Sequence, residues 1–169
     1  MSQGEAVIEV VEYDEAWPLR FGEERALLER ALSPWLAGSI EHIGSTAVRG
    51  LVAKPVIDIM AGVASLEASR PAIEALRALE YQHFPYKTDV MHWFCKPSAA
   101  FRTHHLHLVP VGSALWKERL FFRDALRADT SLAAEYAALK RKLAVTYRLD
   151  REGYTEAKSF FVRRVLERR

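Results

Sequence analysis

Residues 39–63 read SIEHIGSTAVRGLVAKPVIDIMAGV, and no other stretch of the chain says as much about the fold. The β-branched and apolar residues predict one strand over Ser39–Ile43 and a second over Val56–Val63. The second strand is apolar on both faces except at Asp58, which indicates a strand inside a sheet. The segment between the strands has no clean periodicity and contains Gly and Pro, so we predict a functional loop there.

Around this stretch the pattern alternates between strands and helices and then becomes purely helical. We predict further strands over Val7–Val11, Tyr81–Tyr86, Met91–Lys96 and Thr103–Val109, and helices from Asp14 to near Gly38 and over Leu66–Leu79. Three more helices follow over 114–127, 131–147 and 151–167, with caps at Ser113, at Asp129 or Thr130, and at Asp150. We therefore predict an α/β (α+β) fold in one domain over 1–169. A mixed β-sheet flanked by helices fills 1–112, and a helical C-terminal part over 113–169 packs on it.

Composition narrows the class of protein. The chain has 169 residues, 50% of them hydrophobic, which suits a packed globular core. Its one cysteine, Cys95, allows neither an intrachain disulfide nor a metal site built on thiolates. Residues 1–12 lack the pattern of a signal peptide, and no run of 18 apolar residues predicts a membrane span. We expect a soluble, cytoplasmic protein without a membrane partner.

The charge is unevenly distributed along the chain. Residues 1–96 hold 9 basic and 14 acidic residues, whereas residues 97–169 hold 15 basic and 8 acidic residues. The basic C-terminal part favours an anionic partner such as phosphate, and the alternative is that its charges only solubilise helix faces. We expect no nucleic acid partner, because the total net charge is +2 and no nucleic-acid-binding module is recognisable.

The Gly44-Ser45-Thr46 turn follows the first of the two central strands. Glycine lets the backbone approach a ligand closely, and the exposed amides and two hydroxyls can donate to phosphate oxygens. Lys54 would neutralise charge nearby. Asp58 is costly in an apolar strand unless it is paired or binds a metal. The alternatives are an ordinary turn, and an Asp58 carboxylate paired with Lys54 or a buried arginine.

Histidines form a second polar group, in Arg102-Thr-His-His-Leu-His107. His105 and His107 are two residues apart on a predicted strand and so share a face, where both imidazoles can reach one metal ion, or one phosphate if protonated. Arg102 is a further phosphate ligand in this interpretation. Alternatively these histidines are structural, or pair with His83 and His92.

The C-terminal helices contribute two aromatic and basic pairs. Tyr136 and Lys140, like Tyr154 and Lys158, are four residues apart, so each pair shares a helix face. A nucleotide site would use the ring for stacking and the ammonium group for phosphate. The alternative is a core tyrosine covered by the stem of a lysine.

Four segments resemble the GrpB family: VEYDEAWPLRF (11–21), IEHIGSTAVRGLVAKPVIDI (40–59), THHLHLVPVGS (103–113) and YTEAKSFFVRRV (154–165). The likeness runs from about Val7 to Val165. The family is in turn similar to the nucleotidyltransferase superfamily of the DNA polymerase β kind, which implies a nucleotidyltransferase-like fold. Gly44 and Ser45 match its Gly-Ser turn. Asp58, separated from Ser45 by twelve residues, matches its first carboxylate, which implies catalytic roles for Asp58 and Ser45.

The chain departs from the superfamily pattern at the second carboxylate. Met60 stands there, and a thioether is a poor ligand for Mg²⁺. His105 and His107 stand where a third carboxylate is expected, so the clamp for two Mg²⁺ ions is incomplete. We expect a divalent metal on Asp58, His105 and His107, with His42 or Glu41 as a supplement. Mg²⁺ or Mn²⁺ is expected, and the imidazoles also suit Ni²⁺ or Zn²⁺.

Three hypotheses for the function follow. The first is a nucleotidyltransferase-like protein that binds a nucleotide or phosphorylated small molecule with a divalent metal and transfers a nucleotidyl group to an acceptor. The second is a catalytically degenerate relative that only binds such a ligand. The third is a metal-dependent phosphoester hydrolase centred on Asp58, His105 and His107. Sequence alone leaves open whether the protein is an enzyme, and its oligomeric state.

Overall fold

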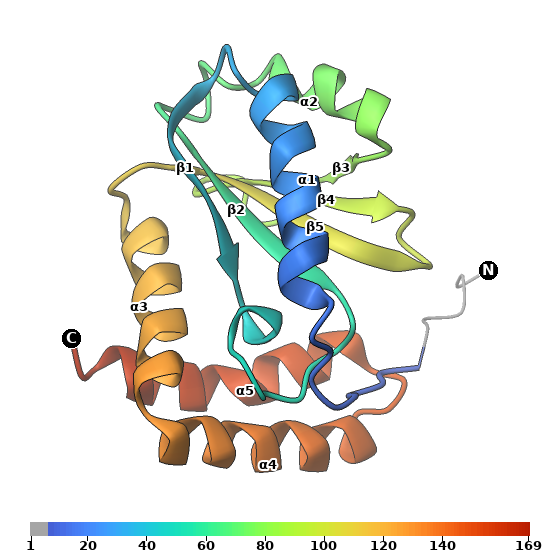
Figure 1. The fold of residues 1–169 in the computed structure, drawn as a ribbon, viewed down its shortest axis with the longest axis vertical. Coiled ribbons are helices and arrows are strands. Elements are labelled where there is room, and N and C mark those ends of the chain that lie inside the picture. Colours follow the sequence, from blue (N-terminus) through green and yellow to red (C-terminus); the bar gives the residue numbers. More distant parts are fainter. Residues whose placement is uncertain (1–6) are drawn as a thin grey trace.

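A five-stranded sheet forms the centre of the computed structural model, which describes residues 7–169 (Figure 1). In spatial order the strands are β1 (Leu36–Ile43), β2 (Ile57–Val63), β5 (Arg102–Pro110), β4 (His92–Pro97) and β3 (Gln82–Phe84). The central pair, β2 and β5, is parallel, and the other neighbours are antiparallel. The sheet is therefore mixed, as predicted, with its two inner strands built from the apolar segments around Asp58 and His105.

Helices cover both faces of the sheet and one end of it (Figure 1). They are α1 (Trp17–Ala31), the short α2 (Ala72–Ala75), α3 (Ala114–Ala128), α4 (Thr130–Thr146) and α5 (Arg151–Leu166), with 3₁₀ turns η1 (Ser45–Ala47) and η2 (Leu76–Leu79). The side chains of Ser113, Asp129 and Asp150 accept backbone hydrogen bonds at the starts of α3, α4 and α5. The predicted fold class, including the helical C-terminal part, is confirmed.

Three predicted elements are wrong in extent. Val7–Val11 forms no strand. Its backbone instead bonds to Arg148 and makes an isolated bridge from Val11 to Ala53. Helix α1 ends at Ala31 rather than near Gly38, because the residue before Pro34 disfavours the helical backbone.

The segment 66–79 is the third of these. It forms only two short helical pieces, α2 and η2, in place of one long helix. Ser65 and Ser69 bond to the local backbone, and Pro71 lacks an N–H, so both compete with a continuous helix.

The two faces of the sheet have different partners. One face of β2 carries Ile57, Ile59 and Ala61, which pack with Trp17 and Leu28 of α1 in the main core. The other face carries Asp58 and Met60, and there Met60 packs with Val109 of β5 and Trp116 of α3.

Helices α4 and α5 lie side by side at the end of the sheet where β2 begins, so the start of β2 faces the C-terminal helices (Figure 1).

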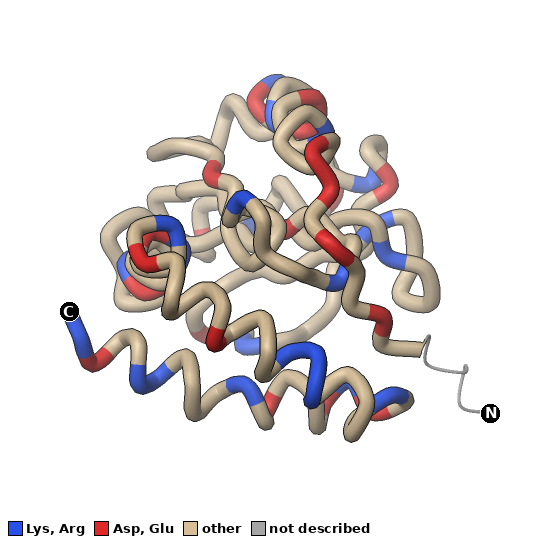
Figure 2. Tube along the Cα trace, turned by 60° about the horizontal axis from the view of Figure 1, so that its bottom comes forward, with Lys and Arg blue, Asp and Glu red and all other residues tan. Residues whose placement is uncertain are grey.

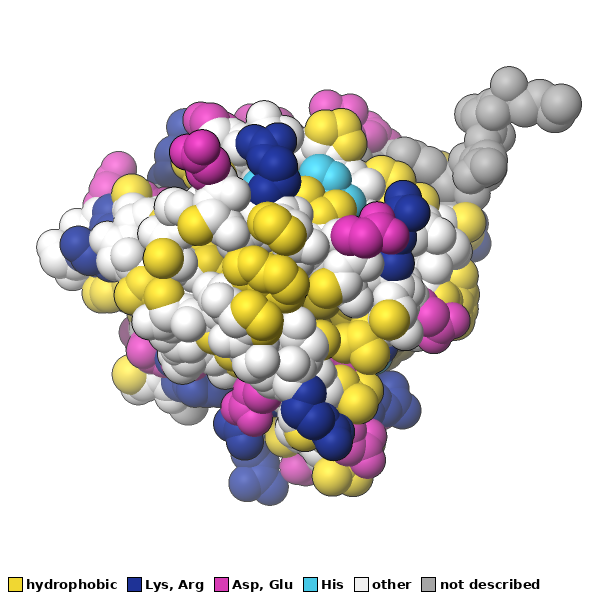
Figure 3. Space-filling model, turned by 90° about the horizontal axis from the view of Figure 1, so that it is seen from above, with side chains coloured by type: hydrophobic (Ala, Val, Ile, Leu, Met, Phe, Trp, Pro, Cys, Tyr) yellow, Lys and Arg dark blue, Asp and Glu magenta, His cyan; other side chains and the backbone are white. Residues whose placement is uncertain are grey.

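Charged residues are spread differently over the two ends of the molecule. Lys and Arg recur along the C-terminal helices, interleaved with Asp and Glu (Figure 2). The opposite end, seen from above, shows hydrophobic side chains in its middle and charges of both signs around them (Figure 3). Among residues 7–169, no helix is both long enough and apolar enough to cross a membrane.

Candidate anion-binding site

Asp58 lies beside two imidazoles on the sheet face that α3 covers. In the parallel register Asp58 is opposite His105, and Met60 is opposite His107. His105 Nδ1 is 3.0 Å from Asp58 Oδ1, a hydrogen bond, and His107 Nε2 is 3.6 Å from the same oxygen. Burial alone would raise the pKa of the Asp58 carboxyl, but the two imidazoles together hold that pKa well below its usual value. Asp58 is therefore an anion over the whole neutral pH range.

Part of the Asp58 side chain is accessible, and the space in front of it is named the Asp58 hollow. The side chain keeps 31% of its area accessible although the surrounding elements enclose it. Gly44, at the end of β1, forms one wall, with φ +71° and ψ −170°. A Cβ atom built on Gly44 would lie 2.9 Å from Asp58 Oδ2. Glycine is therefore required both by its backbone angles and by the approach of the carboxylate. The predicted turn and the predicted carboxylate are in contact.

Two lysines from distant parts of the chain lie against one aromatic ring beside this hollow. Lys54, from the loop before β2, has its Nζ 5.1 Å from the centre of the Tyr154 ring, and Lys158 Nζ is 4.3 Å from the same centre. Both lysines interact electrostatically with Asp58. Tyr154 is buried and one turn before Lys158 on α5, so the helix fixes both side chains. The predicted pair on α5 thus meets the predicted loop lysine.

The second predicted pair lies deeper. Lys140 of α4 is buried, donates a hydrogen bond to the Val52 carbonyl, and has its Nζ 4.8 Å from the centre of the Tyr136 ring. Burial raises the pKa of the Tyr136 hydroxyl, and a hydrogen bond with the Ser45 side chain opposes that rise. Ser45 is the first residue of η1, so α4 contacts the turn directly. Through its hydrogen bond to Val52, Lys140 stabilises the loop that precedes β2.

Most of the charged side chains in this cluster are cationic. Burial and the neighbouring cations Lys54 and Arg119 lower the pKa of Lys158 to about 7, and Asp58 alone among the described carboxylates opposes this shift. Burial, Lys158 and Lys54 lower the pKa of Lys140 to about 6. Burial also lowers the pKa of Lys54. Burial is the largest cause of all three shifts, and the neighbouring cations add to it in Lys158 and Lys140.

Two arginines that the sequence analysis missed belong to the same field. Arg119 of α3 acts electrostatically on His107, Tyr136 and Lys158. Arg151, the first residue of α5, acts on Lys54, and its buried Nε has no hydrogen-bond partner. The position of Arg119 was available as a signal, since it lies three residues after the buried Trp116 and so on the same helix face.

Arg102, the first residue of β5, lies where β5 pairs with β4. Its Nε donates to the Ala99 carbonyl at 3.0 Å, and its guanidinium carbon is 5.3 Å from the centre of the Trp93 ring. It also acts on Lys54 electrostatically. Trp93 in turn lies with its ring centre 5.2 Å from that of His105. Arg102 was predicted from the sequence but Trp93 was not, because Trp93 has the pattern of an ordinary strand residue.

The remaining predicted residues lie elsewhere. His42 faces α1, on the other side of the sheet from Asp58, where it stacks on Phe21. Its Nε2 is 2.8 Å from Thr46 Oγ1, and both residues are buried. Burial lowers the pKa of His42 to about 4. The structure does not bring His42 or Thr46 to the hollow, and instead makes them a brace between β1 and η1.

The side chains around Asp58 include residue types that can bind a divalent metal ion. Among residues 7–169, no three His, Cys, Asp or Glu side chains are grouped so that they could hold a metal ion. Glu41 lies on the same face of the sheet as Asp58. Its Oε2 atom, however, is 2.6 Å from the guanidinium of Arg123 of α3, with which it forms an ion pair. The Nε2 atoms of His105 and His107 are buried without hydrogen-bond partners, and the cationic Arg119 acts electrostatically on His107. This set does not fit a clamp for two metal ions.

A groove of about 800 Å³ lies on the other side of η1. Ala47, Val48, Leu51 and Leu126 contribute its apolar lining, and Arg127 contributes a charge. The Arg127 Nε donates to the Ala47 carbonyl at 2.9 Å, so the groove shares a wall with the turn but not with Asp58. The charged and polar side chains described above lie instead around Asp58. The Asp58 hollow offers lysines, arginines and a glycine turn to an anion with several charges.

The family model described as GrpB protein matches residues 7–168. A UPF0157 protein of Pseudomonas aeruginosa is 39% identical over 95% of this chain and 67% of its own length. The glutamate-rich protein GrpB of Alkalihalophilus pseudofirmus is 34% identical over 98% of this chain and 97% of its own length.

Two solved structures are similar in fold. The crystal structure of conserved protein GrpB from Enterococcus faecalis gives a TM-score of 0.85 at 28% identity, covering 95% of this chain and 96% of that chain. The structure of the GLD-2/RNP-8 complex gives a TM-score of 0.55 at 15% identity, covering 89% of this chain and 60% of that chain. The second likeness concerns the fold alone.

Proposed function

The chain belongs to the GrpB family, and we propose that it binds the phosphates of a nucleotide or another phosphorylated small molecule beside Asp58. One observation carries the proposal. Lys54 and Lys158 both lie against the Tyr154 ring, and Asp58 is the one described carboxylate whose charge acts on the two of them. Burying cations without counter-charge is costly, and an anionic ligand would remove that cost.

The ligand is expected to carry more than one negative charge. Lys54, Lys158, Arg119 and Arg151 come from three separate segments, the loop before β2, α3 and α5, and interact electrostatically with one another. The Gly44 turn leaves backbone close to the ligand, as phosphate-binding loops do. A diphosphate or triphosphate would bridge these groups, whereas a single carboxylate would satisfy few of them.

Binding is better supported than nucleotidyl transfer. Transfer by a clamp of two metal ions needs a second carboxylate two residues after Asp58. Met60 stands there and packs in an apolar cluster with Ile43 and Trp116. A divalent cation carried by the ligand would find Asp58 as the one carboxylate facing the hollow among the described residues, which suits charge balance rather than a two-ion reaction.

Calorimetric titration of the purified protein with ATP and with inorganic triphosphate tests the proposal. Both ligands should bind, and Lys158→Ala should weaken binding at least tenfold because it removes a charge-assisted contact. Lys142→Ala is the matched control, since Lys142 is an exposed lysine of α4. Equal affinities of the two variants, or no binding of either ligand to the wild-type protein, would overturn the proposal.

Phosphoester hydrolysis is a second candidate, favoured by the contact between Asp58 and His105. A carboxylate on Nδ1 fixes an imidazole so that Nε2 can accept a proton from water, and His105 Nε2 has no other partner. Release of inorganic phosphate from nucleoside triphosphates, with Mg²⁺, Mn²⁺, Ni²⁺ or Zn²⁺ and with a chelator, tests it. Hydrolysis should then require His105, with His105→Gln inactive although it still binds triphosphate. No release under any condition would reject this candidate and leave binding.

A further inference from the structure

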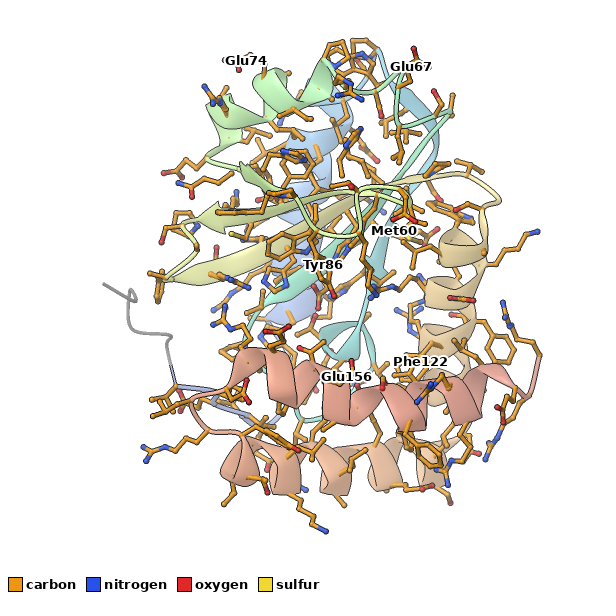
Figure 4. The ribbon with its side chains drawn as sticks, turned by 180° about the vertical axis from the view of Figure 1, so that it is seen from behind. Met60, Glu67, Glu74, Tyr86, Phe122 and Glu156 are labelled. Carbon is orange, nitrogen blue, oxygen red and sulfur yellow. The ribbon has the colours of Figure 1, made fainter. Side chains whose placement is uncertain are left out.

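One exposed aromatic ring, that of Tyr86, is linked to Asp58 by side-chain contacts and has no role in the core. Tyr86 is 44% exposed in a segment, 85–90, whose residues are all exposed. It lies in front of the sheet, on the same side of the molecule as α5 (Figure 4). An exposed tyrosine beside a cationic hollow is where an aromatic part of a bound ligand would be met.

The Tyr86 ring is held in place by a chain of aromatic contacts that leads to Asp58. Its centre is 5.9 Å from that of Trp93, at an angle of 70°, an edge-to-face contact that fixes the ring orientation. Trp93 contacts His105 at 5.2 Å, and His105 is bonded to Asp58. Tyr86 and the phosphate site are therefore only two side chains apart.

The flanking side chains have the same character. The Arg102 guanidinium lies over the Trp93 ring. The centre of the Phe84 ring is 5.8 Å from the centre of the same Trp93 ring. Lys87 Nζ is 5.5 Å from the centre of the Tyr86 ring. Rings and cations in alternation form a platform on which a flat, electron-rich heterocycle stacks well.

We propose that this platform, Tyr86 with Trp93 behind it, stacks the base of a nucleotide whose phosphates occupy the Asp58 hollow. The inference rests on the proposed function and names its ligand class, a nucleotide rather than a phosphorylated molecule without an aromatic ring. Stacking uses the face that all bases share. The four common nucleoside triphosphates should therefore bind within a few-fold of one another.

The test compares ATP with inorganic triphosphate, which carries the same phosphates and no base. The wild-type protein should bind ATP about tenfold more tightly, the order expected for one stacked base. Tyr86→Ala should remove this advantage and leave the affinity for inorganic triphosphate unchanged. Tyr86→Phe, which keeps the ring, should retain it. Because Tyr86 is exposed, its replacement leaves the core intact.

Controls separate this inference from the proposed function. Phe160→Ala removes another exposed ring, on α5, and should behave as the wild-type protein does. Equal binding of ATP and inorganic triphosphate by the wild-type protein would overturn the stacking role while supporting the phosphate site. If neither ligand binds, the phosphate site itself fails. If Tyr86→Ala weakens both ligands equally, Tyr86 contacts phosphate and the stacking role is overturned.

Discussion

At position 44 both the backbone angles and the close approach of the Asp58 side chain require glycine. The Gly44 backbone angles lie in a region open essentially to glycine, and a Cβ atom would meet the Asp58 carboxylate at 2.9 Å. We expect Gly44→Ala to lower the free energy of unfolding by about 3 kcal/mol, near the upper end for such strain. It should also displace Asp58 and weaken triphosphate binding. Urea unfolding and calorimetric titration measure the two effects.

Gly50 provides the matched control for this prediction. It also has a positive φ, +81°, but nothing lies within 4 Å of the position of its Cβ. Gly50→Ala should therefore cost about 1 kcal/mol, from backbone strain alone. If the two variants lose equal stability, the contact between Gly44 and Asp58 is of no energetic consequence.

Lys158 predicts how binding depends on pH. Its pKa of about 7 in the free protein means that it is largely neutral at pH 8.5. A bound anion favours the charged form, so the pKa rises on binding and a proton is taken up. Affinity for inorganic triphosphate should fall as pH rises from 7.5 to 9, by up to about tenfold per pH unit for one such group.

Titrations in buffers with different ionisation enthalpies measure this proton uptake directly. The lysine outside the site again serves as the control, since Lys142→Ala should keep the wild-type pH dependence. An affinity that stays constant between pH 7.5 and 9 would contradict the assignment of Lys158 to the ligand.

At the residue scale, sequence patterns anticipate the parts of the site that lie on regular elements. Asp58 stands out because its strand is otherwise apolar, and spacing along the helices indicates Lys140 and Lys158. The side of the sheet toward which a side chain points is harder to predict. His42 and Thr46 stand beside the predicted turn in sequence, yet their side chains brace the far side of β1. Exposed Tyr86 gives no periodic signal, because its role depends on a neighbour seven residues away across a hairpin.

At the scale of elements, caps decide where the C-terminal helices begin. The Asp150 side chain accepts a hydrogen bond from the Gly153 N–H at 2.8 Å, at the start of the helix that carries Tyr154 and Lys158. We expect Asp150→Ala to lower the free energy of unfolding by about 1 kcal/mol, the usual value of such a cap. Asp150→Asn keeps the accepting oxygen and should cost only a few tenths of a kcal/mol.

Urea unfolding of both variants measures the difference. Since the packing of α5 holds Lys158 in place independently of its first turn, triphosphate affinity should change far less than in Lys158→Ala. A loss in Asp150→Asn equal to that in Asp150→Ala would show that the cap contributes nothing to stability.

The same reasoning explains which elements were predictable. Helices α3, α4 and α5 have both a cap residue and an apolar stripe, and their predicted bounds lie within a residue or two of those found. The segment 66–79 has the stripe without a clean start, and local serine and proline chemistry prevails there. Strands β2 and β5 were predictable from their apolar content, but their parallel pairing, which joins Asp58 to His105, depends on the whole chain.

At the scale of the whole molecule, the site joins the sheet to the C-terminal helices. Asp58 and His105 come from strands, whereas Arg119, Lys140 and Lys158 come from α3, α4 and α5. A ligand in the hollow therefore contacts both parts and stabilises them together. Saturation with triphosphate at one hundred times its Kd should add about 2.7 kcal/mol to stability. For a chain of this size that corresponds to a rise in Tm of about 5–10 °C.

Two probes make this prediction specific. Tryptophan fluorescence reports mainly on the sheet and its covering helices, since Trp17 is the first residue of α1 and Trp93 lies in β4, while far-UV ellipticity is dominated by helix. Both should melt in one transition, and triphosphate should move both by the same amount, because the two parts unfold together. A chelator should leave most of the shift in place, since lysines and arginines supply the charge. A shift confined to one probe would mean that the helical part unfolds separately and that the ligand does not join it to the sheet.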